Sequence, residues 1–362
     1  MNINDIIKNI KDRTTNWFRG LLPARTAALA VSKAMDLNAK AAALSVRTVV
    51  LLAVLCTVVG AKAQGEGKQL PKVYFIKDIT SENIIKVYNA LGRKAEGKNV
   101  AVKLSTGEAG NPNHLQPALI KDLVNMVKGT IIECNTAYGG KRGTVDSHME
   151  VAREHGFTDI ARVDIMDADG QAELPVSGGR HLKTDIVGKN FLNYDFLVVL
   201  SHFKGHPMAG FGGALKNISI GIATPAGKAN IHSGGKTQDV RQVWRMIPAD
   251  TVFQESMAEA SKAIIDHMGD RVLYISVANN LSVDCDCVSS PAEPQMGDLG
   301  IFASLDPVAL DRACIDAVSN SNDHGKVHLL DRINSKHGMH NLKYAEHLGL
   351  GSQRYELVTI GD

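Results

Sequence analysis

Short apolar runs of strand length alternate along this chain with segments whose apolar residues recur at helical spacing. One helical segment is expected to be capped by Ser81 and to stop at Gly92, and a second runs from Pro117 to Val127. Two strand-helix-strand units in succession predict a parallel sheet. The strands expected from these runs are 72–76, 99–104, 130–134, 196–200, 272–277, 299–304 and 355–360.

The second half of the chain keeps the alternation. Asp306-Pro307 is a typical helix start and leads into an amphipathic segment that ends at Val318. The last run, 355–360, alternates apolar and polar residues and is typical of an edge strand. We therefore predict an α/β fold with a mostly parallel sheet, helices on both faces and a small glycine-rich subdomain around residues 225–265.

The first 70 residues differ from the rest. Residues 48–61 are uncharged and mostly apolar, follow Arg47, and precede a small-x-small sequence, Ala61-Lys62-Ala63. A bilayer span needs about 20 such residues, so this run favours a secretory signal. We expect residues 1–63 to form a basic extension with a signal-like segment, residues 64–362 to form one domain, and the product cleaved after Ala63 to be periplasmic without a stable membrane span. An uncleaved anchor, or a buried helix in a cytoplasmic protein, is the alternative.

Charge and cysteine content exclude several classes of protein. There are 40 Lys and Arg against 38 Asp and Glu, a net charge of +2, so no overall field favours nucleic acid as a partner. Five cysteines are too few to staple a fold of this length, and Cys56 would be lost with the signal. The hydrophobic core must therefore supply the stability.

Polar residues follow four of the predicted strands. In open parallel sheets, the loops beyond the carboxyl ends of the strands converge, and ligands bind there. The loop after the 196–200 strand leads into the richest stretch, 201–221, where glycines allow a ligand to approach the backbone and Lys and His side chains offer cationic and titratable groups. These residue types suit a small anion, while a glycine-rich packing turn with solvated lysines is the alternative.

The residues expected at this site form two groups. The candidate catalytic residues are Lys204, His206, Lys216 and His232. The candidate substrate-binding residues are Lys103, Glu108, Asn135, Thr136, Tyr138, Gly212, Gly213, Asn217 and Lys228.

Cys285-x-Cys287 places two sulfurs on one side of an extended segment, a spacing that can chelate a soft metal but rarely lets the two thiols pair with each other. Cys134, at the end of a neighbouring strand, is the expected third ligand, and His206 or Asp284 could complete the set. Zinc and an iron-sulfur cluster are both compatible with these ligands. A redox dithiol, a disulfide to Cys134, and inert buried thiols remain open.

Several familiar motifs are absent. No phosphate-binding loop of the Walker type exists, and a dinucleotide fingerprint begun at Gly210 fails at Leu215. The aspartates around Asp167 lack the spacing of a calcium loop, and no nucleophile elbow accompanies Ser147. A nucleotide-loop enzyme and a serine hydrolase are therefore not favoured.

The blocks 134–138, 201–206, 210–217, 226–236, 284–287, 300–311 and 349–357 resemble the domain-of-unknown-function family 362 (DUF362). The resemblance spans about residues 71–361 and implies an α/β fold and a family often associated with iron-sulfur clusters. Many members carry a ferredoxin-like insert with two cysteine-rich cluster motifs, but here residues 237–242 contain no cysteine. Any thiolate-bound metal must then use Cys134, Cys285 and Cys287.

Two functions follow from the sequence. The first is an enzyme that acts on a small anion, with the lysines holding charge, His206 or His232 as acid or base, and the thiols as a redox or metal centre. The second is a noncatalytic protein that carries a metal, a cluster or a small anion for a partner.

Overall fold

The computed structural model describes residues 69–361. The signal segment and cleavage site expected within residues 1–63 lie outside this range, so the export prediction stays a prediction. Within the described range, no helix is both long and apolar enough to cross a membrane.

An eight-stranded sheet has the order β12-β1-β11-β10-β7-β2-β3-β4, and β11 alone among these strands runs against its neighbours. The mostly parallel sheet expected from the sequence is thus confirmed, and β12 is an edge strand. The strands are β1 (Lys72–Ile76), β2 (Val100–Lys103), β3 (Thr130–Glu133), β4 (Val163–Ile165), β7 (Phe196–His202), β10 (Val272–Ala278), β11 (Gly300–Ser304) and β12 (Glu356–Thr359). Two hairpins, β5 (Gln171–Pro175) with β6 (Thr184–Gly188) and β8 (Lys204–His206) with β9 (Gly210–Gly212), complete the strands.

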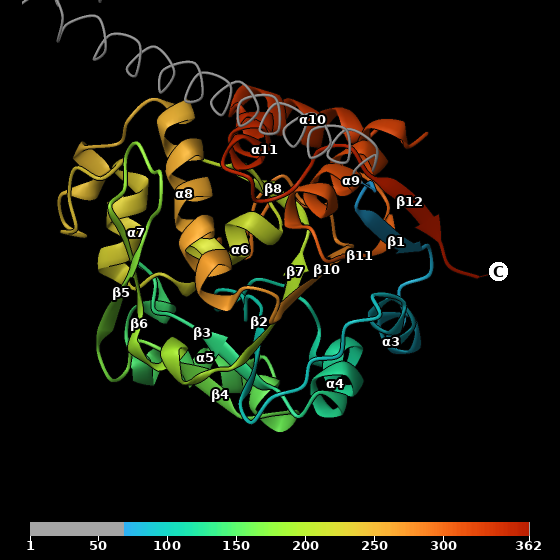
Figure 1. The fold of residues 1–362 in the computed structure, drawn as a ribbon, viewed down its shortest axis with the longest axis horizontal. Helices are drawn as coiled ribbons and strands as arrows, with labels where there is room; N and C mark the ends of the chain where they lie inside the picture. The colour runs from blue at the N-terminus through green and yellow to red at the C-terminus, as the bar shows by residue number, and fades with distance from the viewer. Residues whose placement is uncertain (1–68, 362) are drawn as a thin grey trace, which may run out of the picture. The chain divides into compact units, whose positions relative to one another are not determined.

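Helices cover both faces of the sheet (Figure 1). Alternate side chains of β7 point to opposite faces of the sheet and belong to two hydrophobic cores. Val198 belongs to the core on the face covered by α3 (Ser81–Ala90), α4 (Pro117–Met126) and α5 (Val145–Glu154). Val199 belongs to the core on the face covered by α6 (Ala214–Ile222), α7 (Pro225–His232), α8 (Asp250–Met268), α9 (Pro307–Asn320), α10 (Lys326–Ser335) and α11 (Gly338–His347).

Three details differ from the sequence predictions. Thr80, not Ser81, caps α3: its extended backbone lets its hydroxyl accept a bond from Asn83 N–H at 3.1 Å, and Ser81 is the first helical residue. Strands β1 and β2 are not neighbours, because β11, β10 and β7 lie between them. Residues 225–265 form α7, a short 3-10 turn and most of α8, inside the same compact unit as the rest of residues 70–362.

Candidate functional site

A cavity of about 260 Å³ lies where the loops after β10, β7, β2 and β3 converge. These four strands are parallel neighbours, so their carboxyl ends meet at one edge of the sheet. Two of the predicted residues, Glu108 and Asn135, do not line the cavity. The predicted residues that line it are Lys103, Cys134, Thr136, Tyr138, Lys204, His206, Gly212, Gly213, Lys216, Asn217, Lys228, His232, Cys285 and Cys287.

Lys103, Glu133 and Arg142 form the paired cluster, a set of buried charges that line one part of the cavity. Glu133 at the end of β3 lies 3.1 Å from the Lys103 ammonium and 3.2 Å from the Arg142 guanidinium. It also accepts the Thr106 N–H at 2.7 Å. Burial opposes ionisation of Glu133, but the two cations outweigh burial and lower its pKa to about 2. Every charge in this cluster therefore has an opposite charge beside it.

Other predicted binding residues form hydrogen bonds or ion pairs with Arg142 or with residues near it. Glu108 accepts Lys141 N–H at 2.7 Å and lies 3.6 Å from Arg142, which donates to the Tyr138 hydroxyl oxygen at 2.8 Å. Asn135 is buried and lies within hydrogen-bonding distance of the His148 ring at 3.3 Å. Thr136 donates to the Arg142 carbonyl at 3.1 Å.

Asp286 lies between the two cysteines in sequence and holds a second pair of basic groups. Its carboxylate is 2.8 Å from His202 Nδ1 and 2.6 Å from the Lys204 ammonium. His202 Nε2 is 2.7 Å from the Asn279 carbonyl, which can only accept, so His202 donates there. Burial opposes ionisation of Asp286, yet His202 and Lys204 lower its pKa well below the usual range. The Lys204 charge is thus already matched.

Lys216, Lys228 and His232 form the open cluster, whose basic groups have no carboxylate within ion-pairing distance in residues 69–361. Burial, reinforced by the Lys204 charge, lowers the pKa of Lys216 to about 7. Burial also lowers the pKa of Lys228, whose ammonium donates to the Ala223 carbonyl at 2.5 Å, and lowers that of His232 to about 4. Lys216 and His232 are therefore able to exist as neutral bases near pH 7.

Two N–H groups at the amino-terminus of α6 bind a side chain and are not free for a ligand in the cavity. Asp311 on α9 accepts the N–H groups of Ala214 and Leu215 at 2.6 and 3.0 Å. A Cβ on Gly213 would lie 2.3 Å from the same carboxylate, so this glycine is required for helix packing. Asn217 donates to the Lys103 carbonyl at 3.1 Å and ties α6 to β2.

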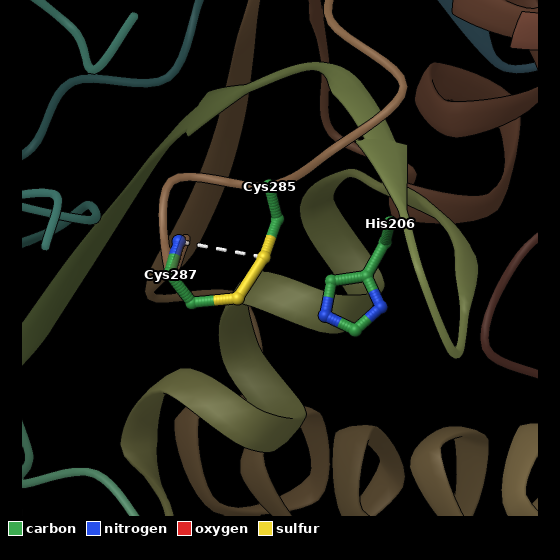
Figure 2. Close-up of side chains that lie close together, drawn as sticks. All are labelled: His206, Cys285 and Cys287. Carbon is green, nitrogen blue, oxygen red and sulfur yellow. Dashed lines mark hydrogen bonds between the residues drawn. A yellow bond between two sulfur atoms is a disulfide. The ribbon is translucent and has the colours of Figure 1, made fainter. Parts of the chain in front are cut away.

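Cys285 and Cys287 are joined by a disulfide, with Cα atoms 5.2 Å apart. The expectation that this spacing rarely lets its thiols pair is therefore wrong for this chain, because the segment bends enough to bring the Cα atoms within disulfide range. The ligand atoms of His206, Cys285 and Cys287 all lie within 4.8 Å of one another. Figure 2 shows the His206 ring turned toward the bonded sulfurs.

Cys134 does not join this group. Its thiol donates to the Ile222 carbonyl at 3.1 Å, and burial raises its pKa above the ordinary value. Asp284, the other proposed ligand, pairs with Arg332 at 3.2 Å. Cys134 thus behaves as a free, buried thiol in the cavity lining.

Zinc or an iron-sulfur cluster does not fit the residues as arranged. An iron-sulfur cluster needs thiolates, and a zinc site built on His206, Cys285 and Cys287 would need them too, but here the two cysteines are bonded to each other. His206 Nδ1 accepts the N–H groups of Met208 and Ala209 at 3.1 and 2.9 Å, so the proton of the neutral ring lies on Nε2. The nitrogen that faces the sulfurs therefore offers an N–H rather than a lone pair.

The sequence reasoning missed four residues that organise the site. His202, Glu133 and Arg142 lie within or beside the loops that were singled out, and Asp286 lies between the two cysteines. A polar residue at the end of a buried strand was the available signal for Glu133 and His202. Nothing in the sequence indicated which lysine each carboxylate would neutralise.

The cavity lining carries more potential cations than carboxylates. The Lys and Arg side chains are Lys103, Arg142, Lys204, Lys216 and Lys228, and the carboxylates are Glu133 and Asp286. Burying unmatched charge is unfavourable, so the excess is stable only if a lysine gives up its proton or an anion enters.

The described part of the chain is thus an α/β protein with a cationic cavity at the carboxyl edge of its sheet. The family model described as domain of unknown function (DUF362) matches residues 100–316, and the chain belongs to this family. No protein of curated function matches the sequence.

The solved structures that are similar to the chain include the following two. One is a Thermotoga maritima protein, at 14% identity and a TM-score of 0.41, covering 68% of this chain and 61% of its own. The other is a lactate racemase apoprotein from Thermoanaerobacterium thermosaccharolyticum, at 16% identity and a TM-score of 0.41, with coverage of 70% and 57%. The chain therefore spans less than two thirds of the length of either.

Proposed function

We propose that this DUF362 protein is an enzyme that binds a small anion in the cavity and transforms it there. The observation that carries the proposal is the open cluster. Lys216 has no hydrogen-bond acceptor within residues 69–361 and faces the cavity, while Lys103 and Lys204 are already paired. An anion beside Lys216 would supply the missing partner and raise the pKa of this lysine.

The open cluster also offers acid-base chemistry. A lysine with a pKa of about 7 exists in both forms near neutrality, which suits proton transfer. His232 Nδ1 lies 2.7 Å from the Lys228 carbonyl and donates to it, so Nε2 of the neutral ring carries a lone pair. We assign Lys216 as the acid or base, with Lys228 holding charge and His232 as an acceptor for a substrate proton.

Sulfate is a suitable probe of anion binding because its charge does not change near neutral pH. We expect sulfate to bind the full-length protein, and Lys216→Met to weaken that binding at least tenfold, as measured by isothermal titration calorimetry. Lys121→Met, an exposed position on α4, is the matched control and should bind as the unaltered protein does. Equal sulfate affinity in all three proteins would refute the anion site.

Turnover distinguishes an enzyme from a carrier. Small phosphorylated and carboxylated compounds that displace sulfate should be screened for chemical change by mass spectrometry. Displacement without change of any such compound would favour a noncatalytic anion-binding protein over an enzyme.

A further inference from the structure

We propose that Cys285 and Cys287 are a reversible dithiol–disulfide pair that exchanges electrons with an external dithiol at the mouth of the cationic cavity. This redox site goes beyond the proposed anion chemistry and does not depend on it. The pair shares the cavity lining with His206 and Lys216 but needs neither a metal nor the anion.

The loop that carries the pair is fixed to its neighbours. Gly205 N–H on β8 donates to the Ser282 carbonyl at 2.8 Å, and Glu108 N–H donates to the Asp286 carbonyl at 2.7 Å. The Asp286 side chain is held at the same time by His202 and Lys204. Because none of these contacts uses a sulfur atom, the two thiols are expected to stay adjacent when the disulfide opens.

The two sulfurs have different surroundings. Cys285 is 4% exposed, whereas Cys287 is more accessible. The Cys287 N–H donates to Cys285 Sγ at 3.4 Å, the dashed line in Figure 2. His206 is close to both sulfurs and directs its Nε2–H into the same space. A negative charge on Cys285 would thus meet two N–H donors.

This asymmetry defines the direction of exchange. The thiolate of an incoming dithiol attacks Cys287 Sγ, a mixed disulfide forms, and the Sγ–Sγ bond breaks with its electron pair on Cys285 Sγ. The second thiol of the incoming molecule, as its thiolate, then attacks the sulfur that this molecule contributed to the mixed disulfide. The external disulfide closes, and Cys287 leaves as a thiolate. The protein gains two electrons, the dithiol becomes a disulfide, and protons pass through solvent.

His206 acts here as a positioning residue. A neutral imidazole N–H is too weak an acid to protonate a thiolate, but it can hydrogen-bond one and so stabilise the reduced state. The Lys216 side chain, on the same cavity lining, adds positive potential to this effect when it is protonated. A more stable thiolate on Cys285 shifts the equilibrium toward the dithiol.

Differential alkylation of the native full-length protein tests the pair. Without reductant, the peptide that contains both cysteines should take up no alkyl group, and after native treatment with dithiothreitol it should take up two. Buried Cys134 and Cys314 are internal controls that should stay unlabelled in both samples. Full labelling before reduction, or resistance to dithiothreitol until the protein is unfolded, would overturn the proposal.

Zinc addition separates the redox pair from a metal site. The reduced protein should be reoxidised by oxidised dithiothreitol at the same rate with and without one equivalent of zinc. Stoichiometric zinc that blocks both alkylation and reoxidation would instead establish a thiolate metal centre and overturn the redox assignment.

Two substitutions test the role of His206. In a glutathione redox buffer, His206→Phe should shift the equilibrium toward the disulfide at least fivefold, because the N–H donor is lost. His206→Gln keeps an N–H donor and should restore most of the equilibrium constant. A structural role alone would move both variants equally, and identical equilibria in all three proteins would remove His206 from the site.

Discussion

The two clusters of charge around the cavity differ in how they are neutralised. In the paired cluster, Glu133 lies between Lys103 and Arg142, and all three side chains are nearly inaccessible to solvent. In the open cluster, Lys216 and Lys228 face the cavity, and no carboxylate among the described residues 69–361 lies within ion-pairing distance of them. The difference teaches that the same residue types neutralise one another in one cluster and leave basic groups unpaired within residues 69–361 in the other.

The largest effect is expected when a charge is removed from the paired cluster. Glu133→Gln leaves Lys103 and Arg142 buried without a full counter-charge, so the free energy of unfolding should fall by about 3–5 kcal/mol. Urea unfolding followed by circular dichroism measures it. Glu82→Gln, which breaks an exposed pair with Lys86, is the control and should leave stability unchanged. Equal effects of the two substitutions would show that the paired cluster is not a scaffold.

A substitution in the open cluster should have the opposite sign. Folding lowers the pKa of Lys216 from 10.5 to about 7, so the buried charge destabilises the folded state at and below neutral pH. Lys216→Met should therefore raise the free energy of unfolding by about 1–3 kcal/mol at pH 7. The gain should shrink as the pH rises from 7 toward 10.5, because the unfolded lysine then also loses its proton.

Urea unfolding of both proteins at pH 7 and pH 10, in buffers without sulfate or phosphate, checks this expectation. A loss of stability in Lys216→Met at pH 7 would mean that the charge of this lysine is already neutralised within the protein.

The smallest expected effect is the pH dependence of sulfate binding, which tests whether the charge of Lys216 holds the anion. An anion favours the charged form of Lys216, so sulfate affinity should be greatest below about pH 7. Above that pH it should weaken by at most about tenfold per pH unit, until the pKa of the lysine in the complex is passed. Titration calorimetry from pH 6 to 9 should show this slope in the unaltered protein and its absence in Lys216→Met. A pH-independent affinity would indicate that another group holds the anion.

The sequence by itself determined the fold class, the approximate bounds of several strands and helices, and the edge of the sheet at which the site lies. Apolar runs of strand length specified β7 and β10 to within two residues, because a strand buried on both faces is almost continuously apolar. The bounds of β1 were also correct, although only part of this strand is buried. Pro117 and Asp306-Pro307 marked the starts of α4 and α9 correctly, since proline is favoured only in a first helical turn. The rule that loops converge at the carboxyl edge then brought most of the predicted residues to one cavity.

Tertiary structure alone decided which charges are matched and which are free. Asp286 neutralises Lys204 across 82 residues, and Glu133 neutralises Lys103 across 30. Distances of this kind depend on strand order, and β1 and β2 show that consecutive strands need not be neighbours. The segment that carries the Cys285–Cys287 disulfide is likewise held beside β8 by the bond from Gly205 N–H to the Ser282 carbonyl. Local pattern carries no information on such pairings, because the energy of a charge depends on its neighbours in space.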